Sequence, residues 1–141
     1  MIVGLGHDLC DVRRIERALS RFGTRFTNRV FTAVERERCG KRARFADCYA
    51  RRFSAKEALA KALGTGFRQG VYWRDIGVVN VPGGKPALRL SGGALTRLME
   101  LVPPGMEARI DLSLTDDREL AHAIVLISAI PKSSKEAVLS G

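Results

Sequence analysis

The sequence predicts a single α+β domain in which helices pack on one face of an antiparallel sheet. The chain has 141 residues, 45% of them hydrophobic, which suits one compact domain with an ordinary core. Strand patterns stand at both ends of the chain, and helical patterns lie between them. Turn residues join two pairs of strand-like segments into hairpins, whose strands are antiparallel. The predicted order is therefore strand, helices, hairpin, helix, hairpin, with no repeat and no second-domain boundary.

The opening strand and the first helix occupy the first 21 residues. Residues Ile2 to Asp8 are apolar and rich in glycine, and they end in a carboxylate, which predicts a strand that sets a metal ligand at the edge of a sheet. Asp11 is a good N-cap for a helix from about Val12 to Arg21. The arginines of this helix fall outside its apolar side, where a solvated charged face is the ordinary alternative to a binding surface.

Two shorter helices follow. Thr24 begins the first of them. Thr32 and Glu35, three residues apart, form a capping box for the second, from Ala33 to about Cys39. Gly40 ends this helix, because glycine is favoured just beyond a helix C-terminus.

The stretch RRFSAKEALAKALGTG, from Arg51 to Gly66, holds the candidate chemistry. Its residues are good helix formers without proline, so a helix is predicted from about Asp47 to Leu63, with Gly64 at its end. Glu57 and Lys61 are four residues apart and therefore share one face of this helix. An exposed ion pair is the ordinary reading of such spacing, and a catalytic acid and base is the alternative.

The second half of the chain predicts two hairpins around a helix. The predicted elements are a strand from Asp75 to Val81, a strand from Ala87 to Leu90, a helix from Gly93 to Leu101, an alternating strand around Ile110, Leu112 and Leu114, and a buried strand from Leu120 to Ile130. Residues 131–141 are small and polar, which predicts a flexible tail after a domain of residues 1–130.

The charge balance predicts anionic partners. Lys and Arg number 24 against 15 Asp and Glu, a formal net charge of +9. Nucleic acid is one such partner, but the chain has no zinc-finger spacing, no RNP motif and few aromatic residues, so nucleic-acid binding is not expected. An acidic protein or a phosphorylated cofactor explains the charge equally well.

The remaining composition predicts a cytoplasmic protein without a membrane segment. No apolar run reaches the length of a membrane span, and the N-terminus lacks the pattern of a signal peptide. Cys10, Cys39 and Cys48 are odd in number and form no CxxC pair, so free thiols are expected. For Cys10 a small buried packing role is favoured over a place at the site.

An ordered set of motifs resembles a known family. The chain carries G-x-D at Gly6 to Asp8, RF-x-x-KEA-x-x-KA-x-GTG at Arg52 to Gly66, DI-x-V at Asp75 to Val78, and GKP at Gly84 to Pro86, before a final strand pair from about Arg109. Over residues 1–130 this set resembles the holo-[acyl-carrier-protein] synthases of the phosphopantetheinyl transferase superfamily.

This resemblance implies an activity and an assembly. The implied reaction transfers 4′-phosphopantetheine from coenzyme A to a serine of apo acyl carrier protein and releases adenosine 3′,5′-bisphosphate. The implied fold is an α+β homotrimer with three active sites at subunit interfaces. The implied cofactor is Mg²⁺, because two carboxylates without His or Cys suit a hard cation.

The resemblance also assigns roles to residues. Asp8 and Glu57 are the implied metal ligands, and Glu57 and Lys61 the implied catalytic residues. Either Glu57 or a water on the metal accepts the serine proton, and Lys61 stabilises or protonates the leaving group. The implied cofactor contacts are Arg52, Lys61, Gly64, Gly66, Lys85 and Pro86, and the implied carrier-protein contacts are Arg14, Arg17 and Arg21, with Arg25 a lesser one.

One departure from the family pattern leaves an alternative open. Many relatives carry His in a strand reading HVS, where this chain has DLS with Asp111. An anion beside phosphates weakens cofactor binding unless Asp111 turns away or pairs with an arginine. A carrier-protein adaptor without catalysis is therefore the second alternative, beside a nucleic-acid-binding module. Lys56 is equally open to a structural and to a functional role.

Overall fold

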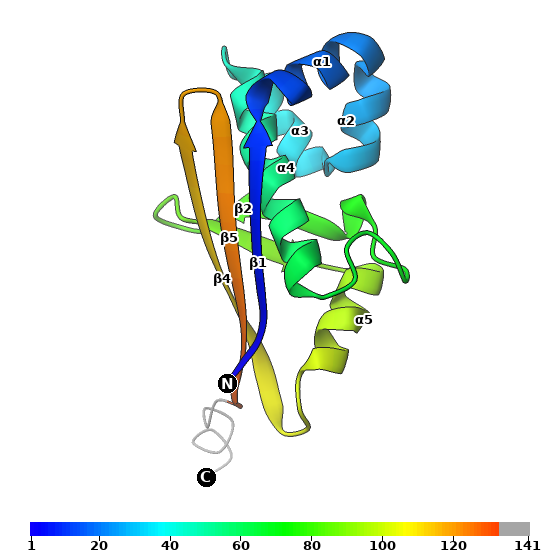
Figure 1. Ribbon diagram of the computed structural model, residues 1–141, viewed down its shortest axis with the longest axis vertical. Helices are drawn as coiled ribbons and strands as arrows, with labels where there is room; N and C mark the ends of the chain where they lie inside the picture. Colours follow the sequence, from blue (N-terminus) through cyan, green and yellow to red (C-terminus); the bar gives the residue numbers. More distant parts are fainter. Residues whose placement is uncertain (133–141) are drawn as a thin grey trace.

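The structure, a computed structural model, describes residues 1–132 and has an α+β fold (Figure 1). In chain order its elements are β1 (Ile2–Asp11), α1 (Val12–Phe22), α2 (Thr24–Val30), α3 (Ala33–Gly40), α4 (Phe45–Ala62), the 3₁₀ turn η1 (Trp73–Asp75), β2 (Ile76–Asn80), β3 (Pro86–Leu90), α5 (Gly92–Leu101), β4 (Met106–Asp117) and β5 (Leu120–Pro131). The predicted order of strand, helices, hairpin, helix and hairpin is confirmed. The predicted tail lies, but for its first two residues, outside the described part of the chain.

The strands form two sheets, whereas the sequence predicted one. Strands β1, β5 and β4 make an antiparallel sheet in that order, and β2 and β3 make a separate antiparallel pair. One backbone donor of β2 is bonded to a side chain, because the Val78 backbone N–H donates to Glu35 Oε2 of α3 at 2.8 Å. This donor is therefore not available to a further strand.

Helix α4 is the central element of the fold and packs on the inner face of the three-stranded sheet (Figure 1). Most of its 18 residues are buried, so it is enclosed on nearly all sides and is not amphipathic. The inner face of β5 is equally buried at its alternate positions, Ala121, Ala123, Val125, Ile127 and Ala129. Helices α1 and α3 also pack on α4. Among residues 1–132, no helix is both long and apolar enough to cross a bilayer.

The contact between β1 and α4 is made by backbone, and two glycines permit it. A Cβ atom at Gly6 would collide with the carbonyl of Ala58, and one at Gly4 would collide with the carbonyl of Ala62. Two residues of a strand advance about 6.6 Å and four residues of a helix about 6.0 Å, so alternate strand positions can meet successive helix turns. The same register brings the Asp8 carbonyl to Ser54, whose Oγ donates to it at 3.0 Å.

The helix ends follow the sequence signals. Asp11 caps α1 by accepting from the Arg13 backbone N–H at 2.9 Å. Thr32 and Glu35 form the predicted capping box of α3. Gly64, after the end of α4, has φ +79°, a left-handed conformation that favours glycine. These predicted caps are confirmed.

The prediction of free thiols is wrong for two of the three cysteines. Cys39 of α3 and Cys48 of α4 form a disulfide, and their Cα atoms are 5.4 Å apart. The packing of α3 against α4 brings the two cysteines together. Their separation of nine residues in the sequence does not predict this disulfide. Cys10 is free and buried, as predicted, and burial raises the pKa of its thiol to about 11.

The close contact of β1 with α4 predicts that Gly6→Ala lowers the free energy of unfolding by about 3 kcal/mol, because a methyl group would force the strand away from the helix. Gly40→Ala is the matched control, since a Cβ at that exposed helical position meets no atom within 4 Å. Urea denaturation of both variants measures the difference. Equal midpoints for the two variants would contradict the backbone contact.

Candidate active site

The candidate site lies where the end of β1 meets the middle of α4. Asp8 lies near the end of β1, on the face that packs against α4, and its side chain is only 13% exposed. Lys61 Nζ lies 3.1 Å from Asp8 Oδ1 and 3.0 Å from the His7 carbonyl oxygen. The strand and the helix thus bring together two residues 53 positions apart in the sequence.

Glu57 lies one helical turn before Lys61 and joins the same cluster. Its pKa is raised, first by burial and then by the negative charge of Asp8, while the positive charges of Lys61 and Arg14 oppose this rise. Two carboxylates close enough for the charge of Asp8 to raise the pKa of Glu57 fit a divalent cation. The sequence-predicted metal ligands are therefore within electrostatic reach of each other.

The side chains at this point are oxygen donors, which suit a hard cation. Within residues 1–132, no group of three or more His, Cys, Asp and Glu side chains is gathered as for a metal site held by protein alone. The pair Asp8 and Glu57 instead fits Mg²⁺, which commonly takes one or two carboxylates and shares its other positions with water and substrate phosphate. No His or Cys side chain favours Zn²⁺ here.

Arg14 of α1 also belongs to this cluster. Its guanidinium lies over the Phe53 ring, 5.4 Å from the ring centroid, and its charge lowers the pKa of Glu57. The sequence assigned Arg14 to partner binding alone. Arg17 and Arg21 are exposed further along α1, and Arg21 lies over the Phe22 ring.

An aromatic row holds the glycine loop that follows α4. The Phe67 ring stacks on Trp73 with centroids 3.7 Å apart, and Trp73 stacks on Phe53 at 5.0 Å. Phe67 directly follows Gly66, which has φ +59° and whose N–H donates to the Ala60 carbonyl at 3.1 Å. The sequence did not predict this row, although Phe53 is part of the motif RF-x-x-KEA and Phe67 directly follows GTG.

Arg52, a predicted cofactor contact, is not brought to the site. It is 6% exposed, and its guanidinium donates to the Cys48 carbonyl at 3.1 Å. Burial lowers its pKa to about 10. In this structure Arg52 therefore supports the packing of α4, because its polar atoms face the interior.

Lys85 and Pro86, the other predicted cofactor contacts, lie at the β2–β3 turn. Figure 1 shows this turn projecting beyond the three-stranded sheet, and β3 packs beside β4. The turn is separate from the glycine loop at the other side of the molecule (Figure 1). A single chain does not bring these residues to Asp8 and Glu57.

Asp111 takes one of the two arrangements that the sequence left open. Its carboxylate accepts from Arg109 Nε at 3.1 Å on the outer face of β4. The positive charge of Arg109 offsets the negative charge of this carboxylate. Asp111 therefore gives no support to the reading of an inactive adaptor.

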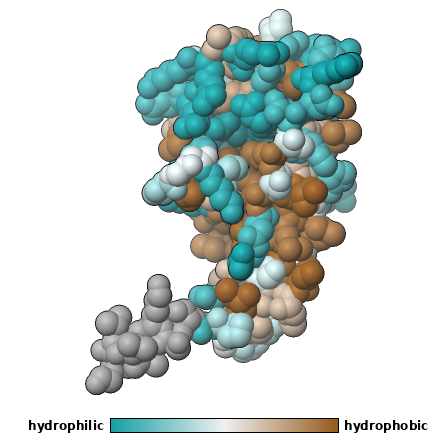
Figure 2. Space-filling model, turned by 90° about the vertical axis from the view of Figure 1, so that its left-hand side faces the viewer, coloured by the Kyte–Doolittle hydropathy of each residue, from teal (hydrophilic) through white to brown (hydrophobic). Residues whose placement is uncertain are grey.

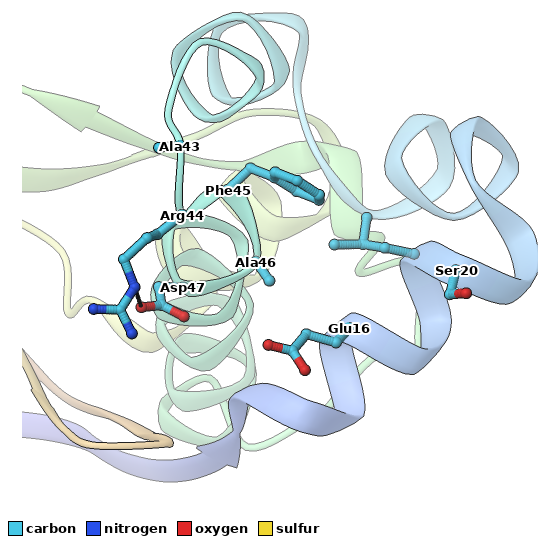
Figure 3. Close-up of a pocket in the computed structure, with 8 residues that line it drawn as sticks. Glu16, Ser20, Ala43, Arg44, Phe45, Ala46 and Asp47 are labelled. Atoms are coloured by element: carbon cyan, nitrogen blue, oxygen red, sulfur yellow. Dashed lines mark ion pairs between the residues drawn. The ribbon is translucent and has the colours of Figure 1, made fainter.

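A separate hollow of about 490 Å³ lies between α1 and the start of α4 (Figure 3). Glu16 and Asp47 line it together with the apolar side chains of Leu19 and Phe45. None of the predicted catalytic residues lines it. Arg44 also lines it and pairs with Asp47 at 3.1 Å, so the hollow offers no free cluster of cations for a phosphorylated cofactor.

The chain matches one protein superfamily over most of its length. The family model of the 4′-phosphopantetheinyl transferase superfamily matches residues 4–122, so the chain belongs to this superfamily. The match includes Asp8, Glu57, Lys61 and the glycine loop.

Particular relatives narrow this class. The holo-[acyl-carrier-protein] synthase of a Methylobacterium species is 64% identical over 134 residues, which cover 95% of this chain and 99% of the relative. The enzyme of that name from Azorhizobium caulinodans is 61% identical, over 92% of this chain and 95% of its own.

Solved structures agree in fold. A holo-[acyl-carrier-protein] synthase from Neisseria meningitidis matches with a TM-score of 0.79 and 35% identity, over 91% of this chain and 99% of its own. A synthase from Bacillus anthracis, in complex with coenzyme A (3′,5′-ADP), matches with a TM-score of 0.72 and 36% identity, over 90% of this chain and 96% of its own.

Proposed function

We propose that this chain is a holo-[acyl-carrier-protein] synthase, which transfers 4′-phosphopantetheine from coenzyme A to a serine of apo acyl carrier protein and releases adenosine 3′,5′-bisphosphate. The observation that carries this proposal is the packing of β1 on α4, which places Asp8 beside Glu57 and Lys61. Close relatives of that name over nearly the whole chain support it.

Phosphoryl transfer requires that negative charge be neutralised and that the reacting groups be aligned. Asp8 and Glu57 would hold Mg²⁺, which supplies positive charge to the pyrophosphate of coenzyme A when bound. Lys61 is the solvent-accessible cation of the cluster, since its side chain is 53% exposed. Its ammonium can leave Asp8 and stabilise the phosphate oxygens of the leaving group.

Glu57 is also placed to accept the serine proton. A carboxylate becomes a better proton acceptor as its pKa rises, and burial together with Asp8 raises the pKa of Glu57. This pKa belongs to the site without its metal ion, so a water on the metal stays the alternative to Glu57 that the sequence left open. Arg14 and Lys61 balance the two negative charges around the reacting hydroxyl.

The exposed arginines of α1 suit an acidic carrier protein. Arg14, Arg17 and Arg21 lie on the outside of this helix, at the end of the molecule where β1 delivers Asp8, and Arg25 continues them on α2. Rim charges of this kind steer association and make it depend on salt. A carrier that docks on α1 would bring its serine toward Arg14 and Glu57.

The outer face of the three-stranded sheet supports a homotrimer. Leu5 and Leu9 of β1 are 66% and 57% exposed, and Leu120 and Ile124 of β5 are each 42% exposed. Figure 2, which views the molecule from the side of β4 and β5 in Figure 1, shows hydrophobic surface over much of this side. Such a face is buried in many assemblies. In the trimer, Lys85 and Pro86 would reach the site of a neighbouring subunit.

The transferase reaction can be tested directly by mass spectrometry. Incubation with coenzyme A, Mg²⁺ and apo carrier protein should increase the carrier mass by one phosphopantetheine unit. Glu57→Gln should lower kcat by about a hundredfold or more with the fold intact, because a ligand and proton acceptor loses its charge. An unmodified carrier, tested with several carrier proteins, would refute the function. Full activity of Glu57→Gln would refute only the assigned role.

The ion pair of Lys61 with Asp8 predicts competition with the metal. Lys61→Met should bind Mg²⁺ about threefold to tenfold more tightly in the absence of coenzyme A, since the ammonium no longer occupies Asp8. Isothermal titration calorimetry measures this affinity. Lys41→Met is the control, because Lys41 pairs with Glu37 on a different helix. Unchanged or weaker Mg²⁺ binding by Lys61→Met would rule out the competition.

The apolar sheet face predicts the effect of a surface charge on assembly. Leu5→Lys should convert trimers into monomers, because a charge would have to be buried in the interface. Val34→Lys is the control, since Val34 is similarly exposed, at 60%, but lies on α3. Analytical ultracentrifugation distinguishes the species. A trimeric Leu5→Lys variant would place the interface elsewhere.

A further inference from the structure

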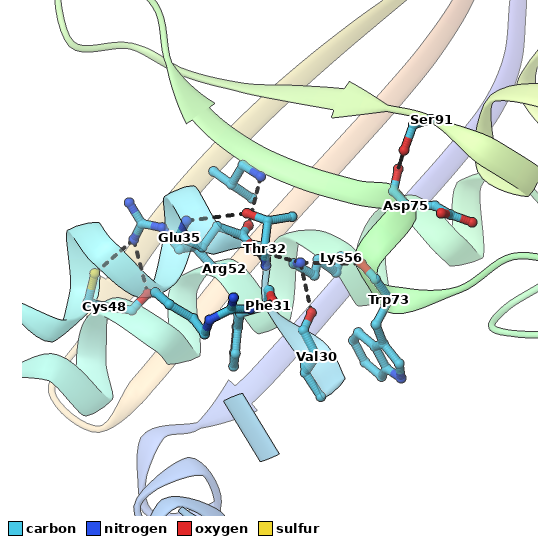
Figure 4. A network of polar contacts seen from close by, with 12 residues as sticks. Val30, Phe31, Thr32, Glu35, Cys48, Arg52, Lys56, Trp73, Asp75 and Ser91 are labelled. Atoms are coloured by element: carbon cyan, nitrogen blue, oxygen red, sulfur yellow. Dashed lines mark hydrogen bonds and ion pairs between the residues drawn. The ribbon is translucent and has the colours of Figure 1, made fainter. Parts of the chain in front are cut away.

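A fully buried ion pair lies directly behind the candidate site. Lys56 Nζ is 2.6 Å from Glu35 Oε1, and both side chains are 0% exposed (Figure 4). Burial removes both charges from water, and desolvation lowers the pKa of Lys56 although Glu35 opposes this shift. The mechanism described above uses neither residue.

The Lys56 ammonium is saturated by hydrogen bonds. Besides Glu35 it donates to the Val30 carbonyl at 2.8 Å and to the Trp73 carbonyl at 3.3 Å. An ammonium has three donors, and all three are used. Lys56 therefore ties α4 to the end of α2, to α3 and to η1.

The Glu35 carboxylate is equally well bonded. Its Oε1 also accepts from the Thr32 backbone N–H at 2.8 Å, and its Oε2 accepts from the Val78 backbone N–H at 2.8 Å. Strand β2 and the N-terminus of α3 are thus hydrogen-bonded to the same pair. Figure 4 shows Glu35 and Lys56 side by side within this network, with Thr32, Val30 and Trp73 around them.

The pair is connected to the site on two sides. Lys56 immediately precedes Glu57 on α4. On the other side, the Trp73 carbonyl is held by Lys56, while the Trp73 ring stacks on Phe67, which follows Gly66. The path from the ammonium to the glycine loop is therefore one residue and one ring stack long.

Stability alone does not explain such a pair. Apolar residues of similar volume often replace a buried ion pair without loss of stability, whereas a polar pair can select one arrangement of the segments around it. Here the pair fixes the position of η1. Its residue Trp73 contacts the Lys56 ammonium through the backbone carbonyl and the glycine loop through the ring.

We propose that Glu35 and Lys56 are a positioning pair, which holds Trp73 and through its ring the loop of Gly64 to Phe67 in the conformation that binds coenzyme A. This inference rests on the proposed function, because it concerns the binding of that co-substrate. Neither residue touches the reacting atoms.

The double variant Glu35→Gln with Lys56→Met tests this role. It removes both charges at once, so that no unpaired charge stays buried, and methionine replaces most of the lysine stem. The variant should bind coenzyme A at least tenfold more weakly and show a KM for coenzyme A raised by a similar factor. Its kcat should change less than threefold, because Glu57 and Lys61 stay on the unbroken α4.

Trp73 supplies a second readout, since it is the only tryptophan of the chain. In the double variant its fluorescence should shift to the red and become more accessible to acrylamide, because the ring leaves its stack with Phe67. Ile127→Ala is the control: Ile127 is 0% exposed in β5, so its truncation weakens the core without touching the pair. The control should keep both the emission and the coenzyme A affinity of the parent.

Each result of these measurements either supports or overturns the positioning role of Glu35 and Lys56. A folded double variant with the emission and the coenzyme A affinity of the parent overturns the positioning role, and so does an equal loss of affinity in Ile127→Ala. Should the double variant fail to fold, Phe67→Leu breaks the same path at the loop, and unchanged Trp73 emission and affinity there would overturn the role. A parent chain that does not bind coenzyme A refutes the proposed function instead, while the emission of Trp73 still reports whether the pair holds the loop.

Discussion

The fold depends on the approach of one strand backbone to one helix backbone. Gly4 and Gly6 remove the side chains that would keep β1 away from α4, and the strand then lies against the helix carbonyls. Close packing leaves this contact little freedom to slide, because any shift would bring a larger residue over the carbonyls. Asp8 follows in the same register, and for this reason the carboxylate faces α4 instead of solvent. The two glycines of this predicted strand are thus the condition for a site built from two elements.

The charges of the site are arranged by burial as much as by proximity. Asp8 is largely covered, whereas the Lys61 side chain is 53% exposed, so one partner of this pair faces the interior and the other faces solvent. Behind them the pair of Glu35 and Lys56 is entirely buried and saturated with hydrogen bonds. Exposed pairs are weak and exchange partners easily, whereas buried pairs are costly to break. A lysine and a carboxylate thus form one pair that is open to solvent and one that is closed to it.

Local signals explain what could be predicted from the sequence. The capping box at Thr32, the cap at Asp11 and the shared helix face of Glu57 and Lys61 all depend on residues within four positions of one another, and the structure contains all of them. The convergence of Asp8 on this face needed the family resemblance, because periodicity does not say which strand meets which helix.

Features that depend on tertiary packing could not be predicted in this way. Glu35 and Lys56 are 21 positions apart, and the charge of each by itself predicts an exposed residue. The disulfide of Cys39 and Cys48 joins two helices whose angle no local pattern sets. Arg52 was assigned to the cofactor through its motif, yet the burial of α4 on nearly all sides places it inside. The central position of α4 is common to these cases. Lys56, Cys48 and Arg52 all belong to this helix, and its neighbours bury them.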